Sequence, residues 1–501
     1  MVKRTRSATP SEPYSAKPNT KAAAPAHAGA RKGSGQTSSK KESTTPDDPL
    51  AGRLLALTEP SHFKPPEPWL ELGRHLQPPD GGNGRNLSVV VGVDFGTAFT
   101  KLAIRFADKV HLVTWEGISG APNPFFLPGE VSRVADGYIF VGRAKHAVDA
   151  WAGIKQPFLK PDPSAEARAT ATAFLAWVFR YARAWVFKNH GALTKNRRLA
   201  WNVAVGCPTD AAQDRILVHT YQQIAAAAWL LSRSPDGCSL KTADRALDVM
   251  KSPTADAAQL DSLAIVPEFV AQIAGYARSA QRQRGLHFLV DVGAGTLDLA
   301  TFNVERDQTE DHRDHYAILF SAVELLGTHF LMEARRAAIG GALSWSDTGL
   351  TPDTAALGKE LPKFAEVIQS ADARFEETVC ARIRRVVEIT KGRRSPHSSV
   401  WHEGLPIFVS GGGASCDLYR RAINEACRRT SVRPILLPLG LGEDVAKSKL
   451  SETDQHRVSV AYGLTSDASI LARITASSQI PDFVLRRTRR PRPDHEALYP
   501  R

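Results

Sequence analysis

Two short turns that combine an aspartate with glycines stand about 200 residues apart in this chain. The first turn lies in residues 93–97 (VDFGT) and follows an apolar run over 87–91. The second lies in residues 291–298 (DVGAGTLD) and follows an apolar run over 288–290. Each pattern indicates a strand, an Asp-x-Gly turn and a second strand. Two such hairpins can face one another and act on a single ligand.

The residue types in these turns indicate a phosphorylated ligand. Glycine lets the backbone approach an anion closely, and the amides of a turn point at phosphate oxygens. Asp94 and Asp291 can then hold a magnesium ion, mostly through water. One such turn is more often an ordinary hairpin. Two of them, with the flanks described below, favour a site for Mg²⁺ and a nucleoside triphosphate.

Alternating strand and helix patterns predict the elements that carry these turns. Strand-like runs occur over 87–142 and at 201–206, 262–266, 286–305, 406–409 and 434–438. Helical spacing predicts helices at 165–188, 210–231, 268–283, after Gly327, and at 362–391, 417–429 and 454–464. Residues 232–262 are polar and are expected to be an irregular insertion. The two halves follow one βββαβα plan, which predicts an α/β fold of two lobes with a central nucleotide cleft.

Composition suggests the domain boundaries. Residues 1–86 are expected to form a disordered basic tail and linker, with folding starting near Leu87. The first lobe is expected to span 87–266, with 444–470 returning to it, and the second lobe 267–443. Residues 471–501 are expected to be a basic C-terminal tail.

Several motifs resemble those of the actin-like ATPase superfamily, most closely the ATPase domain of the seventy-kilodalton heat-shock chaperones. GVDFGTAFTKLAIRF (92–106) and VDVGAGTLDLATF (290–302) resemble its two phosphate loops. IVPEFVAQIAGY (265–276) and VSVAYGL (458–464) resemble its two connecting helices, and IFVSGGGAS (407–415) resembles its adenosine loop. WNVAVGCPTDAAQDR (201–215) resembles the segment before the first connecting helix. The resemblance covers about residues 87–466 and implies ATP hydrolysis with Mg²⁺.

The resemblance also implies roles for individual residues. Asp94 and Asp291 would hold magnesium through water, Glu268 would orient or activate the attacking water, and Lys155 would reach the γ-phosphate. Asp298 would support the second loop. The remaining expected nucleotide contacts are backbone positions in the loops and at one helix start: Gly96, Thr97, Ala98, Gly293, Ala294, Gly295, Thr296, Gly327, Gly411, Gly412 and Gly413.

The chain departs from the family pattern in three places. Ala98 and Phe99 stand where the family usually has Thr and Tyr, so hydroxyl contacts in the first turn are lost. The basic helix that clamps adenine is not recognisable, and Arg335, Arg336 or Lys363 are the expected substitutes. Only 37 residues follow Leu464, too few for the family's peptide-binding sheet and lid, so the expectation is an ATPase domain alone.

Composition narrows the classes of function further. The net charge of +12 comes mostly from residues 1–41 (+8) and 482–501 (+3), so contact with nucleic acid or an anionic surface is expected only through the tails. No apolar run is long enough to span a membrane. Five scattered cysteines without a Cys-x-x-Cys pair favour reduced thiols in a cytoplasmic protein, with neither a zinc site nor disulfides.

Four functions remain open at this point. The first is a slow, ATP-driven switch that binds ATP and ADP and presents a surface to an unknown protein partner. The second is an actin-like protein that polymerises or segregates cargo with ATP. The third is a small-molecule kinase, for which no additional acid in a distinctive setting is found, and the fourth is a nucleotide sensor that does not hydrolyse its ligand.

Overall fold

The computed structural model of this chain describes residues 68–79, 84–116, 123–142, 147–159, 162–208, 214–235, 237–306, 313–341 and 351–482. All of them belong to one compact unit that spans Asp48–Arg501. Of the expected tails 1–86 and 471–501, residues 1–67 and 483–501 lie outside the described residues.

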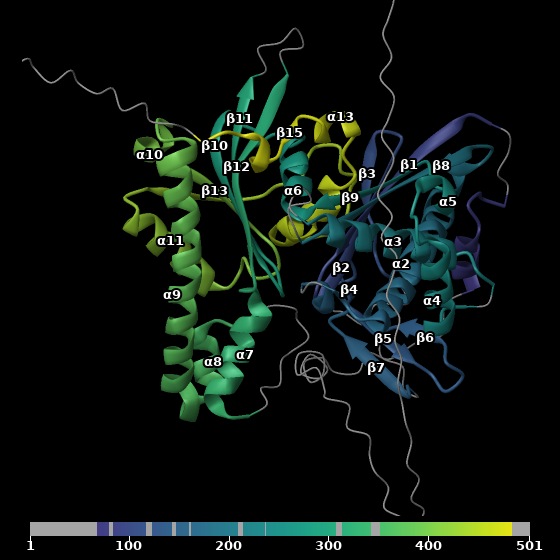
Figure 1. The fold of residues 1–501 in the computed structure, drawn as a ribbon, viewed down its shortest axis with the longest axis horizontal. Helices are drawn as coiled ribbons and strands as arrows, with labels where there is room; N and C mark the ends of the chain where they lie inside the picture. Colours follow the sequence, from purple (N-terminus) through teal and green to yellow (C-terminus); the bar gives the residue numbers. More distant parts are fainter. Residues whose placement is uncertain are drawn as a thin grey trace, which may run out of the picture. The chain divides into compact units, whose positions relative to one another are not determined.

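The first six-stranded sheet contains the first aspartate–glycine turn (Figure 1). Its path is β3-β2-β1-β8-β9, and β4 pairs with β2. Strands β1, β2 and β3 are antiparallel, whereas β8 and β9 run parallel to β1. The strands are β1 (Asn86–Phe95), β2 (Phe99–Phe106), β3 (Lys109–Leu112), β4 (Leu127–Pro128), β8 (Arg198–Cys207) and β9 (Ser262–Pro267).

The second six-stranded sheet repeats this plan and contains the second turn. Its order is β14-β13-β10-β11-β12-β15, with β10, β11 and β12 antiparallel and β13 and β14 parallel to β10. The strands are β10 (Gly285–Val292), β11 (Leu297–Arg306), β12 (Asp314–Glu324), β13 (Leu405–Ser410), β14 (Pro434–Pro438) and β15 (Ile474–Thr475). With β4 and β15 set aside, both sheets therefore place their third, second, first, fourth and fifth strands in the same order. The predicted α/β class with a duplicated βββαβα plan is confirmed.

A small sheet and a set of helices complete the described part. The small sheet has the order β6-β5-β7, formed by β5 (Glu130–Arg133), β6 (Ile139–Val141) and β7 (Asp149–Ala152). The α-helices are α2 (Ala165–Thr194), α3 (Arg215–Leu231), α4 (Leu240–Val249), α5 (Ala255–Ala258), α6 (Glu268–Ala277), α7 (Thr328–Ile339), α8 (Thr354–Glu360), α9 (Ala365–Ile389), α10 (Val400–Glu403), α11 (Asp417–Arg429), α12 (Ser459–Gly463) and α13 (Ala468–Leu471). Short 3-10 helices span Pro68–Arg74, Gln156–Leu159, Pro362–Phe364, Glu452–Val458 and Ser477–Gln479, and a π-helical turn spans Thr390–Arg394.

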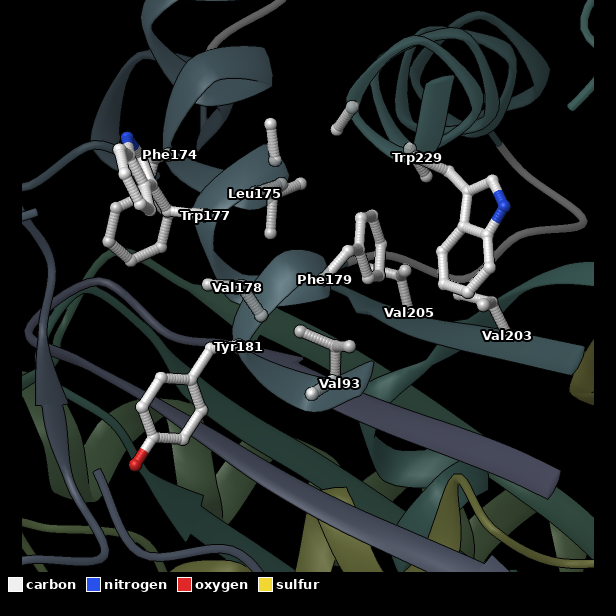
Figure 2. Close-up of a cluster of buried hydrophobic side chains, with 14 of the residues drawn as sticks. Val93, Phe174, Leu175, Trp177, Val178, Phe179, Tyr181, Val203, Val205 and Trp229 are labelled. Carbon is white, nitrogen blue, oxygen red and sulfur yellow. The ribbon is translucent and has the colours of Figure 1, made fainter. Parts of the chain in front are cut away.

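Helix α2 forms the centre of the first core. Its residues 169–187 are all buried and mostly apolar, as expected for a helix that is covered all round. Figure 2 shows Phe174, Leu175, Val178 and Phe179 of this helix packed near strand and helix residues of the same core. The Phe179 and Trp229 rings meet edge to face, 5.4 Å apart, which joins α2 to α3. This packing fixes strands β1 and β8, and so the end of β1 where the first turn begins.

Helices α9 and α11 lie side by side and cover the second sheet (Figure 1). Their inner faces bury apolar residues such as Val379, Ile383 and Ile423. Their outer faces are joined by Arg–Glu pairs, including Arg421 with Glu376. Exposed ion pairs of this kind contribute little to stability, so the burial of apolar side chains is the main interaction that holds the two helices together.

Several element predictions are confirmed. Helix α11 and strand β14 have the predicted bounds of 417–429 and 434–438, and α2 contains the predicted helix 165–188. The helix predicted at 454–464 is a 3-10 helix, Glu452–Val458, followed by α12. The helix predicted to reach residue 283 ends at Ala277, because a local turn follows in which the Tyr276 hydroxyl accepts from the amide of Gln283.

Three other expectations were wrong. Residues 232–262 are not irregular, because α4 begins with a Ser239–Thr242 capping box and buries Ala243. Folding does not start near Leu87, since the 3-10 helix Pro68–Arg74 packs on α2 with Leu70 buried. Residues 474–475, expected in a tail, form β15 on the edge of β12.

The structure also bears on the expectations for the cysteines and for membrane-spanning helices. The five cysteines are buried and make no disulfide. Among the described helices, none has both the length and the apolar content that crossing a bilayer requires.

Candidate functional site

The two aspartate–glycine turns, which are remote in sequence, are in contact. A Cβ atom added at Gly295 in the second turn would lie 2.7 Å from Oγ1 of Thr97 in the first. That distance is shorter than real Cβ contacts allow, so this approach needs glycine at position 295. The structure therefore brings together the turn between β1 and β2 and the turn between β10 and β11.

The first turn carries a partly buried ion pair. Asp94 is 4% exposed and lies directly opposite Lys101 in the β1–β2 register. Nζ of Lys101 lies 3.0 Å from Oδ2 of Asp94, and 3.4 Å from the position of a Cβ built at Gly96. The backbone of this turn is held at its far side, where the amide of Gly129 donates to the carbonyl of Ala98. A lysine is thus placed beside the backbone that is expected to approach phosphate.

Sequence reasoning missed Lys101. The sequence did contain a signal for this residue. In a tight hairpin, the register predicts which residue of the second strand lies opposite an aspartate near the end of the first strand. Family-based reasoning looked only for Lys155.

The second turn places two buried carboxylates opposite one another. Asp291 on β10 and Asp298 on β11 are directly paired in register, and both are buried. The hydroxyl of Thr296 donates to Oδ2 of Asp298 at 2.7 Å, while the amide of Gly293 donates to the carbonyl of Thr296. Among the described residues, the remaining oxygen of each carboxylate, Oδ1, accepts no hydrogen bond. The site therefore contains buried acceptor oxygens that are left without a donor.

The start of helix α7 supports the second turn from behind. The amides of Thr328 and His329 donate to the carbonyls of Gly293 and Ala294, at 3.0 and 2.9 Å. A Cβ at Gly327 would lie 2.3 Å from the Ala294 oxygen, so this contact needs glycine. The amides of Thr328 and His329 are thus already bonded to the second turn. The close contact at Gly327 also helps to hold that turn in place.

Lys155 and Glu268 form an ion pair that is almost fully buried. Lys155 is 2% exposed and Glu268 is 7% exposed, and Nζ bonds to Oε1. Glu268 is the first residue of α6, directly after β9, and a Cβ built at Gly206 of β8 would lie 3.2 Å from its Cγ. The structure thus brings the loosely matched Lys155 next to the expected water-orienting carboxylate.

Electrostatics ties these groups into one cluster. Burial lowers the pKa of Lys155, but the nearby Glu268, Asp94 and Asp298 outweigh burial and raise it, so the ammonium form is favoured. Burial, followed by the charges of Glu268 and Asp94, raises the pKa of Asp291 to about 6. Burial and the charge of Glu268 also raise the pKa of Asp298 well above its usual range.

This cluster has an excess of negative charge. Its four carboxylates outnumber its two ammonium groups, those of Lys101 and Lys155, so full ionisation would leave two negative charges, and the raised pKa values of Glu268, Asp291 and Asp298 reflect burial and this excess. Buried charges are normally paired or bound to a metal, so the arrangement fits a divalent cation. Within the part of the chain that the structure describes, no three acidic, histidine or cysteine side chains are grouped closely enough to bind a metal directly. The Oδ1 atoms of Asp291 and Asp298, which have no donor among the described residues, are oxygen ligands of the kind that Mg²⁺ takes one or two at a time while it retains water.

The triple-glycine segment packs on the same aspartate. Gly411 has a positive φ of 85°, and a Cβ there would lie 2.2 Å from Oδ1 of Asp291. The amide of Gly413 donates to the Val292 carbonyl at 2.9 Å, and a Cβ at Gly413 would collide with that valine side chain. Gly412 differs, since the nearest atoms to a Cβ there belong to Arg457 at 3.9 Å. Gly411 and Gly413 thus fix the segment against β10, and Gly412 leaves space for close approach of a ligand.

One expected base contact was wrong. Arg335 is fully buried and bonds Asp372 through two nitrogens, at 2.7 and 2.8 Å, and also the carbonyl of Pro352. A guanidinium held in this way cannot substitute for an adenine clamp. Lys363 is exposed in the 3-10 helix before α9, and Arg336 is partly buried on α7. Arg457, which sequence reasoning did not consider, lies beside Gly412 and over the ring of Phe126 at 3.9 Å.

Comparisons with known proteins add little to this geometry. No protein-family model matches the chain, and no curated protein does. Among solved structures, one titled "MamK double helical filament" is similar, with 13% sequence identity and a TM-score of 0.40, covering 75% of this chain and 98% of that chain. A likeness with this TM-score does not establish a shared fold, and the α/β class rests on the strand order of the two sheets.

Proposed function

We propose that this chain binds Mg-ATP between its two aspartate–glycine turns and hydrolyses it slowly, as a nucleotide-dependent switch resembling the ATPase domain of the heat-shock 70 kDa chaperones. The observation that carries the proposal is the contact between Thr97 and Gly295, which joins the two turns over a buried cluster with excess negative charge. A chain that only folds gains nothing from four carboxylates gathered in its interior.

Phosphoryl transfer needs positioning and charge neutralisation more than covalent chemistry, and the residues suit that task. Lys101 and Lys155 place positive charge beside the turn backbone and beside Glu268. Glu268 is held by Lys155 and is suited to orient a water molecule. Asp94 and Asp291 would hold magnesium through water, and the bound ion would neutralise phosphate charge.

The altered first turn is compatible with backbone binding. Phe99 packs on Phe126 with ring centroids 5.9 Å apart, and the Ala98 carbonyl is bonded to Gly129. The turn is thus fixed by packing and by its backbone, and the hydroxyls that the family usually supplies here are absent. Slow turnover is expected for this reason.

Magnesium-dependent binding tests the proposal. Calorimetry of the full chain with ATP and Mg²⁺ should show binding that Asp94→Ala and Asp291→Ala abolish. Asp248→Ala is a matched control, because Asp248 lies on α4 with its side chain 74% exposed. Unchanged ATP affinity in both site variants would contradict the proposal.

Two alternatives share this site and differ in outcome. An actin-like protein would assemble with ATP, and light scattering would then rise on nucleotide addition; a flat trace at high protein concentration counts against assembly. A nucleotide sensor would bind Mg-ATP without releasing phosphate, which hydrolysis of radiolabelled ATP by the wild-type chain decides.

A further inference from the structure

Gln272 is a buried polar residue at the junction of several elements. It is 1% exposed and stands four residues after Glu268 on α6, so both side chains lie on the same face of that helix. Neither the sequence patterns nor the resemblance gave this residue a role.

The amide of Gln272 makes three contacts from one nitrogen. Its Nε2 lies 2.9 Å from Oδ2 of Asp291, 2.9 Å from Oγ of Ser410 and 3.2 Å from Oγ of Ser459. An ionised carboxylate only accepts hydrogen bonds, so the Gln272 amide must face Asp291 with its nitrogen and not with its oxygen. Oε1 of Gln272 has no partner among the described residues. The side chain thus serves as a donor to β10, β13 and α12 together.

The Ser459 hydroxyl is itself oriented. It donates to the carbonyl of His456 at 2.8 Å, which leaves its lone pairs free to accept from Gln272. The contact with Gln272 therefore depends on where α12 lies.

Helix α12 is packed tightly on both of its neighbours. A Cβ at Gly463 would lie 1.8 Å from the Ala271 carbonyl of α6, and a Cβ at Gly92 of β1 would lie 2.5 Å from the Ala461 carbonyl of α12. Close-packed backbones of this kind move together rather than separately. Close packing through α12 thus connects β1, which carries Asp94, with the helix that carries Gln272.

We propose that Gln272 is a positioning residue: through Oδ2 it fixes the orientation of the Asp291 carboxylate, which is proposed to hold the hydrated cation, and it couples this orientation to the packing of α12. This inference rests on the proposed function. Outer partners of metal-binding carboxylates usually change metal affinity or activity by about 10- to 100-fold when removed.

The experiment measures how much Mg²⁺ the full chain needs to bind a fluorescent ATP analogue. Gln272→Met keeps the side-chain volume and removes the donor, and it should raise the half-saturating Mg²⁺ concentration about 10-fold or more. Ser459→Ala removes the α12 acceptor, together with the hydroxyl bond to His456, and should shift the same value in the same direction by a smaller factor. It also keeps the test open if Gln272→Met does not fold. Gln223→Met is the control, because Nε2 of Gln223 donates to the Leu247 carbonyl within the α3–α4 region.

The outcomes separate the inference from the function on which it rests. A Mg²⁺ requirement unchanged in both Gln272→Met and Ser459→Ala, with wild-type binding intact, overturns the inference alone. Equal loss of nucleotide affinity with Mg²⁺ and with a chelator also overturns it, because that result indicates general loosening. Absence of Mg²⁺-dependent binding in the wild-type chain overturns the proposed function as well.

Discussion

The Lys155–Glu268 pair has a chemical meaning at the scale of single residues. A buried lysine paired with a buried glutamate is expensive to bring out of water, and it often gains little stability over an apolar pair. Its position beside Asp94 and Asp298 is therefore better explained by a task in the site than by stability. The pair holds the carboxylate of Glu268 in one place, which is the requirement for aligning a water molecule.

Glu268→Gln should therefore separate binding from turnover. The amide keeps the shape of the side chain and can still bond Lys155, but it is a far weaker base than the carboxylate. We expect ATP hydrolysis to fall by about 10²-fold or more, with Mg-ATP affinity within a few-fold of wild type. Release of radiolabelled phosphate measures the turnover, and equilibrium binding measures the Mg-ATP affinity. Turnover within two-fold of wild type would show that Glu268 has no catalytic role.

Some of these residues could be predicted from the sequence, and others could not. Asp94, Asp291 and Gly295 stand in turns whose chemistry is local, so short motifs are enough to find them. Arg335 was misjudged because its partner Asp372 lies 37 residues away, and no local pattern shows that pair. The role of Gln272 could not be predicted for the same reason, since its partner Ser459 is 187 residues away in the chain.

The central feature at the scale of elements is the contact between the two turns. Gly295→Ala should keep them apart, because the new methyl group would lie 2.7 Å from Thr97 Oγ1. We expect ATP affinity to fall about 10-fold or more while the chain stays folded, since one displaced turn of this kind costs about 1–3 kcal/mol. Gly191→Ala is the matched control, as nothing lies within 4 Å of a Cβ there. If calorimetry finds equal ATP affinities for Gly295→Ala and Gly191→Ala, the contact between the turns has no part in nucleotide binding.

Strand β10 also predicts a pH dependence of stability. Burial lowers the pKa of His287 to about 4, below its ordinary value of 6.5, and its ring lies between Phe302 and Phe408. The folded chain therefore favours neutral His287, and this stabilising contribution is present above pH 6.5 and lost as the pH falls toward 4. The loss is about 3 kcal/mol for this group at full extent.

His287→Phe should remove this contribution without removing the ring packing. Its unfolding temperature should fall less than that of wild type between pH 7 and pH 4.5. Calorimetric scans at both pH values check this, and parallel falls in the two proteins would show that His287 is not responsible.

The elements differ in how well the sequence predicts them. Helix α11 has strong amphipathic spacing, and its bounds were found correctly. Helix α4 was missed because it is only ten residues long and polar on average, although its apolar residues stand at helical spacing, and it is stabilised by packing on α2 and α3. Tertiary burial, which a local window does not see, decides such short helices.

The charge distribution matters at the scale of the whole molecule. Residues 1–41 carry a net charge of +8, whereas the chain between the two terminal segments is nearly neutral. Deleting 1–41 should abolish retention of the chain on heparin or non-specific DNA at low salt, and leave ATP turnover unchanged. In the intact chain, binding should weaken steeply with added salt. Equal retention of both forms would place the polyanion contact elsewhere.

The edges of the second sheet carry one further consequence. Strand β15 occupies part of the β12 edge, and β14 at the opposite edge begins and ends with proline, which has no amide hydrogen to donate. Strand β14 therefore has fewer backbone donors than its length would give, and strand-to-strand pairing between copies is disfavoured at its border. Copies that associate at that border would have to recognise one another mainly by side chains.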